Sequence, residues 1–264
     1  MLRTFIFTTL LLAGFAASAH DFYLMPDTFF PKRGSMLQFH LYVGDEFKQE
    51  EERPVQYYIN KTYQWITGSG SQNFLRRYPD STMPVFSEQV DFSGQGLLAI
   101  TRDYARIRLA PAKFASYLQE EGLDEILKQR AAFSSKDSVR EKYTRHLKSL
   151  VASDDGKGKL YKKVLGHTLE LILLQNPYTK QTGDELEAQV LFRGKPLPGA
   201  ALEAICKDAN GEIHRTVLKS DRSGNIKFRL VQRGAWIVRI THMIPVTGDA
   251  DYESFWASYT FGIR

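Results

Sequence analysis

The sequence predicts a mostly β protein that consists of two β-sandwich domains with a two-helix insertion between them. In both halves of the chain, short runs alternate apolar and polar residues, which is the period of a strand with one buried face. Turn-forming pairs such as Asn210-Gly211 separate these runs. Between the β-rich halves, apolar residues recur every three or four positions, as in an amphipathic helix. The length of 264 residues suffices for two domains with ordinary buried cores.

Residues 1–19 have the features of a secretory signal peptide. Arg3 provides a positive start, the apolar segment after it is too short to span a bilayer, and Ala17-Ser18-Ala19 is a small-residue cleavage site. We therefore expect cleavage between Ala19 and His20, which leaves 245 of the 264 residues in a periplasmic mature chain. No later segment approaches the roughly 18 consecutive apolar residues of a transmembrane helix, so the mature protein is not expected to be transmembrane.

The first sandwich domain is expected to cover residues 20–110. The run MLQFHLYV, residues 36–43, alternates strictly and predicts a half-buried strand. Its two faces are Leu37, Phe39, Leu41 and Val43 on one side, and Gln38, His40 and Tyr42 on the other. Further β-prone runs follow at VQYYI, YQWI and GLLAITRDY, separated by clusters of Gly, Ser and Asn.

Residues 111–159 are expected to form the helical insertion and a linker. Helical periodicity appears in FASYLQEEGLDEILKQR and in VREKYTRHLKSLV, where Tyr143, Leu147, Leu150 and Val151 would form an apolar stripe. The segment ASDDGKGK, residues 152–159, is polar and contains glycine, as linkers do.

The second sandwich domain is expected to cover residues 160–264. Seven short β-prone runs with turn chemistry between them predict an antiparallel sandwich. The runs are LELILL, DELEAQVLF, AALEAIC, HRTVLK, NIKFRLV, AWIVRITHM and SFWASYTF. Cys206, the single cysteine, lies on the apolar face of one of them and is expected to be a buried, unreactive thiol.

The net charge of +5 is unevenly distributed. The segment Lys128 to Lys163 holds eleven Lys and Arg residues against four Asp and Glu residues, and it is either a solvated helix face or a surface for an anionic partner. The expected export, together with the lack of interleaved basic and aromatic residues, argues against binding of nucleic acid.

Several segments together resemble a known family. GKPLPGAALEA at 194–204, SDRSGNIKFRL at 220–230 and then GAWIVRI resemble the prealbumin-like or carboxypeptidase-regulatory-like β-sandwich, which gives an Ig-like arrangement for the second domain. With AHDFYL, EKYTRHLKSLV, LGHTLELILLQNPY and the final HM and DYESFWASYTF, the whole mature chain resembles the exported DUF4198 family. That resemblance implies a periplasmic component of cobalt or nickel uptake, with a metal-uptake transporter component as its partner. The matching positions are His20 with Asp21, and His242 with Met243.

The candidate metal ligands are histidines and one acid from distant segments, because the chain has no CxxC, HExxH or other closely spaced ligand motif. After cleavage, His20 would offer an amine and an imidazole nitrogen to one ion, a donor pair typical of N-terminal copper and nickel sites; the alternative is a residue that merely follows the cleavage site. His242 shares an apolar face with Trp236, so a core role is the alternative, but the loop after it carries Asp251. His40 lies on the polar face of its strand, near the acidic run from Asp45 to Glu52.

The other histidines are expected to have structural or surface roles. His167 alternates with Leu169 and Leu171 and is expected to be structural, whereas His146 and His214 are expected at the surface.

The function that these features predict is periplasmic binding and delivery of a divalent transition metal. The resemblance favours Ni²⁺ or Co²⁺, and the chemistry of an N-terminal histidine favours Cu²⁺. His20, His242, Asp251 and His40 are the predicted ligands. No enzymatic activity is expected, because the chain has no GxSxG, P-loop or dinucleotide motif. The alternatives are a non-catalytic structural or adhesive envelope module that binds a protein or an anionic surface partner, and a copper-dependent oxidase built on His20.

Overall fold

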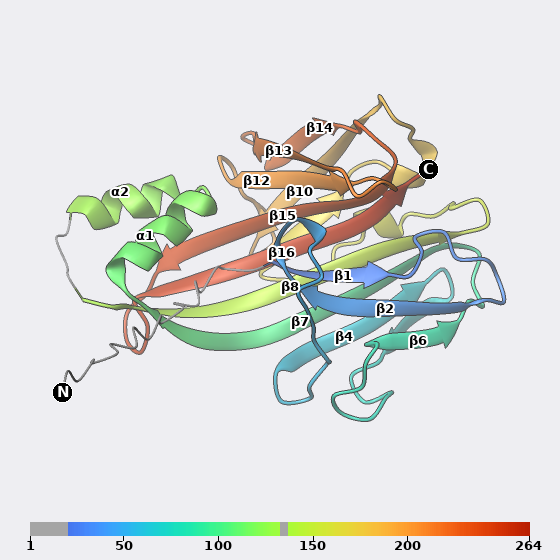
Figure 1. Ribbon diagram of the computed structural model, residues 1–264, viewed down its shortest axis with the longest axis horizontal. Coiled ribbons are helices and arrows are strands. Elements are labelled where there is room, and N and C mark those ends of the chain that lie inside the picture. Colours follow the sequence, from blue (N-terminus) through green and yellow to red (C-terminus); the bar gives the residue numbers. More distant parts are fainter. Residues whose placement is uncertain (1–20, 133–136) are drawn as a thin grey trace, which may run out of the picture.

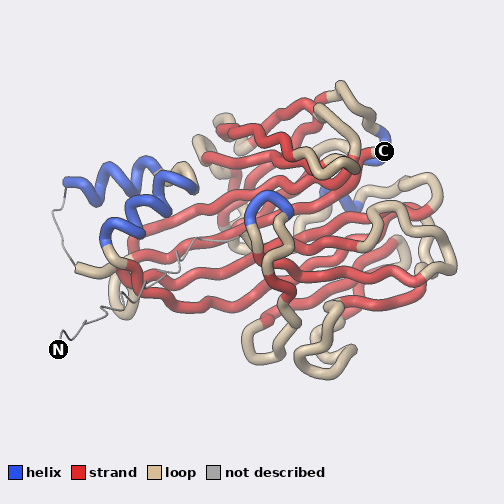
Figure 2. The backbone as a smooth tube through the Cα atoms, viewed as in Figure 1, coloured by secondary structure: helices blue, strands red, loops and turns tan. Residues whose placement is uncertain are grey.

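The computed structural model describes residues 21–132 and 137–264 and is mostly β in that part (Figures 1 and 2). The strands of the first half are β1 (Phe22–Pro26), β2 (Met36–Val43), β3 (Glu51–Glu52), β4 (Asn60–Thr67), β5 (Gly70–Asn73), β6 (Phe86–Gln89) and β7 (Gly94–Leu109). The helices α1 (Pro111–Glu120) and α2 (Asp124–Ala132) follow. The later strands are β8 (Val139–Ser153), β9 (Leu169–Leu173), β10 (Glu185–Phe192), β11 (Lys195–Pro196), β12 (Ala201–Lys207), β13 (Ile213–Lys219), β14 (Asn225–Arg229), β15 (Gly234–Pro245) and β16 (Tyr252–Ile263). Three short 3-10 helices are η1 (Asp45–Phe47), η2 (Leu160–Lys162) and η3 (Pro177–Thr179).

One long sheet of eight strands runs through the molecule, in the order β13-β12-β15-β16-β8-β7-β4-β5. Its neighbouring strands are antiparallel except β16 and β8, which pair in parallel from Tyr252 opposite Glu141 to Thr260 opposite Ser149. This parallel pair joins β8, with β7, β4 and β5 beyond it, to β16 and the other late strands β15, β12 and β13.

Two smaller sheets cover opposite faces of the long sheet. The sheet of β1, β2, β3 and β6 packs on the face that we call the N-face, and the sheet of β9, β10, β11 and β14 packs on the C-face. Neighbouring residues of β7 show the two sides, because Leu98 packs with Phe39 of β2 whereas Leu97 packs with Leu171 of β9. Figure 1 shows β1 and β2 in front of the long sheet.

The two helices cover the other end of the N-face (Figure 2). Pro111 occupies the first turn of α1, where its missing N–H is tolerated. Phe114 and Leu118 of α1 and Ile126 of α2 pack with Val139 and Trp256 in a separate cluster. The N-face is therefore covered by β1 and its neighbours at one end and by helices at the other.

Most predicted strands are confirmed. MLQFHLYV is β2, and each of the seven runs predicted in the last hundred residues overlaps one of the strands β9, β10, β12, β13, β14, β15 and β16. Cys206 is fully buried, and burial raises the pKa of its thiol to about 11, which keeps it protonated.

The second predicted helix is wrong, because VREKYTRHLKSLV lies in strand β8. Both helices of the insertion lie in the segment before it, at Pro111–Glu120 and Asp124–Ala132. The segment 152–159 does not separate two domains either, since β8 extends to Ser153 and the long sheet contains strands from both halves. The two sandwiches share one sheet and lie on its two faces. The predicted signal peptide, residues 1–19, lies outside the described residues.

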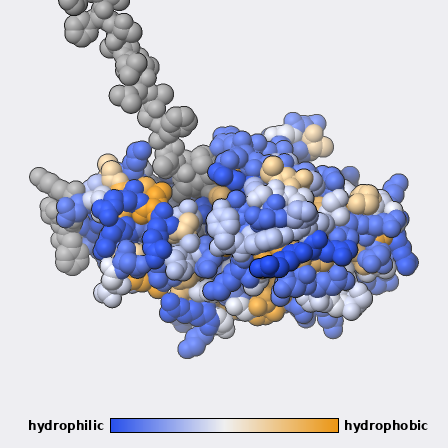
Figure 3. All heavy atoms as spheres, turned by 90° about the horizontal axis from the view of Figure 1, so that it is seen from below, coloured by the Kyte–Doolittle hydropathy of each residue, from blue (hydrophilic) through white to orange (hydrophobic). Residues whose placement is uncertain are grey.

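No helix in the described ranges is long and apolar enough to cross a membrane. The face drawn in Figure 3 is mostly hydrophilic, with small, scattered hydrophobic areas.

Candidate functional site

A row of side chains crosses the N-face between β1 and the helices. Arg102 of β7 lies opposite Arg145 of β8, Arg145 lies opposite Trp256 of β16, and Trp256 lies opposite Thr241 of β15. We call these four residues the cross-strand row. They share the N-face because their neighbours along each strand, such as Ile100 and Leu147, pack with the sheet of β1 and β2.

Strand β1 rests on this face by its edge. The Ser258 hydroxyl donates a hydrogen bond of 2.9 Å to the carbonyl of Phe22, and the Thr260 hydroxyl donates one of 2.7 Å to the carbonyl of Leu24. Because one edge of β1 faces the long sheet, its side chains lie parallel to the sheet surface, and successive side chains point in opposite directions along the row. Asp21 reaches Arg239 of β15, whereas Phe22 lies over Arg145 of β8.

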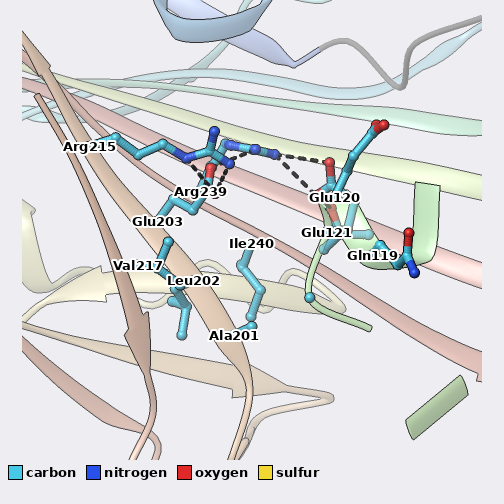
Figure 4. A pocket seen from close by; sticks show the side chains of 12 residues that line it. Gln119, Glu120, Glu121, Ala201, Leu202, Glu203, Arg215, Val217, Arg239 and Ile240 are labelled. Carbon is cyan, nitrogen blue, oxygen red and sulfur yellow. Dashed lines mark hydrogen bonds and ion pairs between the residues drawn. The ribbon is translucent and has the colours of Figure 1, made fainter. Parts of the chain in front are cut away.

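Three carboxylates surround the guanidinium of Arg239. Its Nη1 is 2.9 Å from Oδ1 of Asp21 and 3.0 Å from Oε2 of Glu121, and its Nη2 is 2.6 Å from Oε2 of Glu203. The Thr241 hydroxyl donates a further hydrogen bond of 2.7 Å to Glu121. We call these five residues the Arg239 cluster, and Figure 4 labels three of them, Glu121, Glu203 and Arg239, at a pocket of about 170 Å³.

The cluster and its neighbours hold more carboxylates than guanidiniums. Arg215 of β13 pairs with Glu203 and lies 3.6 Å from Glu46, and Oδ1 of Asp45 accepts a hydrogen bond of 3.3 Å from the backbone N–H of Asp21. In the ion pairs of the described chain, Asp21, Glu46, Glu121 and Glu203 therefore share two guanidiniums, those of Arg215 and Arg239.

The electrostatics reflect this excess of negative charge. Burial raises the pKa of Asp21 to about 8; Arg239 opposes the shift, and the charges of Glu121, Asp45 and Glu203 add to it. Burial also raises the pKa of Glu121. Burial alone would lower the pKa of Arg239, but its three carboxylate partners raise it. An additional cation here would stabilise the ionised form of Asp21.

The predicted metal ligands are not brought together. His20 and Ala19 lie outside the described residues. His242 lies on the C-face, with its ring 4.5 Å from that of Phe192, and burial lowers its pKa. Asp251 forms an ion pair of 2.8 Å with Arg140, which lowers its pKa.

His40 lies on the outer side of β2, where its ring nitrogens are 2.8 Å from Glu52 and 3.0 Å from Asp27. Its neighbours Phe39 and Leu41 face the long sheet instead. The described members of the predicted ligand set, His242, Asp251 and His40, therefore do not meet in one site. Within the described ranges, no group of three or more His, Cys, Asp or Glu side chains could hold a metal ion.

The error at His242 has a simple geometric cause. Arg239 and Thr241 point to the N-face, and successive residues of a strand point to opposite faces, so His242 points away from Asp21. Sequence reasoning missed Glu121, Glu203 and Arg239, although Arg239 interrupts the apolar run AWIVRITHM with a charge. It also placed His146 at the surface, whereas this residue is buried.

Comparisons with known proteins identify the family of this chain, but they indicate no activity. Among solved structures, the chain resembles a tetra-tandem repeat in the extending region of a large adhesion protein, at 10% identity over 93% of this chain and 50% of that chain, with a TM-score of 0.24. It also resembles the D0-D1 domain of intimin, at 10% identity over 90% of this chain and 96% of that chain, with a TM-score of 0.21. The chain spans about half the length of the first structure, and such TM-scores support no functional argument. No curated protein matches the sequence. The model of the family described as "Domain of unknown function (DUF4198)" matches residues 17–244, so the chain belongs to that family.

Proposed function

We propose that the exported, processed chain binds one divalent transition-metal ion at its N-terminal histidine, for capture or delivery in the periplasm. One observation carries the proposal. Asp21, the residue bonded to His20, is fixed in the Arg239 cluster, where carboxylates outnumber guanidiniums. A cation held beside this cluster gains electrostatic stabilisation that increases as water is excluded.

The donors follow from this position. His20 supplies its amine and imidazole nitrogens, because consecutive Cα atoms lie about 3.8 Å apart and residue 20 therefore adjoins Asp21. We assign the oxygen donors to Asp21 and Glu121, which meet at Nη1 of Arg239, in place of His242, Asp251 and His40. Nitrogen and carboxylate oxygen together suit borderline ions such as Ni²⁺, Co²⁺ and Cu²⁺. The preference for nickel or cobalt over copper rests on the family resemblance.

Calorimetric titration of the processed protein with Ni²⁺, Co²⁺ and Cu²⁺ tests the proposal. We expect one site, and we expect at least a tenfold loss of affinity when one extra glycine precedes His20, since the amine then moves away from the imidazole. At pH 7, binding should also release a proton from Asp21, because a nearby cation lowers a carboxyl pKa that burial raises to about 8. Equal affinity of both forms would refute the N-terminal site.

Paired variants test the assigned oxygens. Glu121→Gln should weaken binding by at least tenfold, since one charge about 4 Å from another at an effective dielectric near 20 contributes about 4 kcal/mol. His242→Gln and His40→Gln are the controls and should bind as the unchanged protein does, because these residues lie on the C-face and on the outer side of β2. Weaker binding by His242→Gln with unchanged binding by Glu121→Gln would contradict the assignment.

The basic segment gives less support to an anionic docking partner. Within the described part of Lys128 to Lys163, five basic side chains already pair with acids: Lys128 with Glu125, Arg140 with Asp251, Lys142 with Glu253, Lys148 with Glu170, and Lys157 with Asp155. The segment is also divided between α2, β8 and the loop at η2. A processed protein without metal affinity would favour the envelope-module alternative.

A further inference from the structure

Two arginines stand side by side in the cross-strand row. Arg102 and Arg145 are directly opposite in the antiparallel pair of β7 and β8, where Cβ atoms lie about 5 Å apart. Like charges in such positions repel each other, and guanidiniums remain charged in proteins. The pair therefore requires something that offsets its repulsion.

The described residues provide no carboxylate partner for this pair. Neither arginine is in an ion pair in the described ranges, and Nη1 of Arg102 and Nε of Arg145 are buried there without a hydrogen-bond partner. Burial lowers the pKa of Arg102 to about 10, with the charges of Arg145 and Arg53 as further causes. Glu141 attracts Arg145, but its carboxylate accepts hydrogen bonds from Tyr117 and Ser254.

Aromatic rings hold the two guanidiniums in place. Both lie over the ring of Phe22, Arg145 at 4.0 Å and Arg102 at 5.2 Å from its centroid. Arg145 also lies 4.5 Å from the centroid of Tyr143 and 5.4 Å from that of Trp256. Such contacts orient the guanidinium planes and offset part of the charge, but they leave Nη1 of Arg102 and Nε of Arg145 without an acceptor in the described ranges.

The backbone is irregular beside Arg102 on both sides. The pairing of β7 with β8 shifts between Arg102 and Ala105, and the pairing of β4 with β7 shifts between Asn60 and Thr62, next to Arg102. β-Bulges often re-aim a side chain beside a functional site. Here they lie at the residue that carries the first guanidinium of the pair.

We infer that Arg102 and Arg145 form a binding site for the oxyanion group of a small ligand, with Phe22, Tyr143 and Trp256 as its apolar wall. Two guanidinium forks match the paired oxygens of a carboxylate or a phosphate, and the planar rings accommodate the rest of the ligand. The inference does not rest on the proposed function, because neither arginine is among the assigned metal donors.

Thermal unfolding and calorimetry of the exported protein in metal-free buffer test the inference. Sodium succinate and sodium phosphate serve as the carboxylate and phosphate probes, with sodium chloride at equal ionic strength as the reference. We expect a saturable rise of Tm with at least one oxyanion beyond that with chloride, and the more effective probe identifies the ligand class. The same rise with chloride as with both oxyanions would overturn the site.

Substitutions locate the effect. Arg102→Met and Arg145→Met should each lower oxyanion affinity at least tenfold, while Tm without anion stays equal or rises, because a buried charge without a partner is removed. Arg229→Met, at an exposed position of β14, is the matched control and should bind as the unchanged protein does. If a methionine variant does not fold, Arg145→Lys keeps the charge but loses the fork and should still weaken binding. Unchanged affinity in folded Arg102 and Arg145 variants would refute the inference.

Discussion

Two histidines stack in the interior on the C-face. His146 of β8 and His167 are 4% and 9% exposed, and their ring centroids lie 5.1 Å apart. Nδ1 of His146 is 3.4 Å from the Thr101 hydroxyl, while its Nε2 is buried and makes no hydrogen bond within the described ranges. Burial lowers the pKa of both imidazoles to about 3. Both side chains are therefore neutral in the folded protein at physiological pH.

These histidines make the fold sensitive to acid. The unfolded chain has ordinary imidazoles with a pKa of about 6.5, so below that pH it takes up protons that the folded chain does not bind. The free energy of unfolding should fall as the pH drops from about 6.5 towards 3, by about 1 kcal/mol per pH unit for each histidine. His146→Phe should reduce this slope in urea unfolding at pH 7, 5.5 and 4.5. His214→Phe, at an exposed site, should keep it, and identical slopes in all three proteins would contradict the assignment.

Strand β8 shows where periodicity misleads. Its apolar residues Leu147, Leu150 and Val151 recur at three and four, which favours a helix, yet Leu150 faces the C-face layer and Leu147 and Val151 face the N-face layer. A strand that is covered on both faces loses the simple alternation of a half-buried strand. Strand β2, which is covered on one face, keeps its alternation and was predicted correctly.

The candidate site was only partly predictable for a related reason. The sequence marked the region of His20 and Asp21, but Glu121, Glu203 and Arg239 come from a helix end and two strands more than 30 residues apart. Their meeting depends on strand register, such as Glu203 opposite Arg239, which no local pattern specifies.

The edge contact of β1 should control the proposed metal site. The Thr260 hydroxyl donates to Leu24 and is 2.7 Å from the Ser149 hydroxyl, so Thr260→Val removes a buried donor and leaves the Leu24 carbonyl unpaired. Such a loss costs about 1–3 kcal/mol of unfolding free energy. Hydrogen exchange should accelerate in β1 more than in β10, and metal affinity should fall with it.

Thr216→Val on β13 is the control for this prediction, because Thr216 is an exposed threonine in a strand of the same sheet. This variant should leave hydrogen exchange in β1 unchanged, and it should change the free energy of unfolding by no more than about 0.5 kcal/mol. Equal protection of β1 in the Thr260 and Thr216 variants would show that the edge contact does not hold the strand.

At the scale of the whole molecule, the shared sheet makes the two sandwiches one structural unit. The cores on the N-face and the C-face lie on either side of the same strands, so β7 and β8 contribute to both. The parallel pairing of β16 with β8 connects the last strand to the middle of the chain. The sequence patterns identified β2, β4, β7 and most strands after residue 168, but they missed β1, β6 and β8 and wrongly indicated a strand at VQYYI. The long-range parallel pair has no local signature, so the sequence suggested separate domains.

The shared sheet predicts a single cooperative unfolding transition. Loss of either core removes one face of β7 and β8 and exposes the other, so neither sandwich should persist alone. Leu97→Ala, on the C-face, and Leu98→Ala, on the N-face, should each lower the one transition by about 2–5 kcal/mol, the cost of a large-to-small substitution in a core. Scanning calorimetry should give equal calorimetric and van't Hoff enthalpies for all three proteins. Two transitions, of which each variant lowers only one, would show that the sandwiches unfold as independent domains in spite of their common strands.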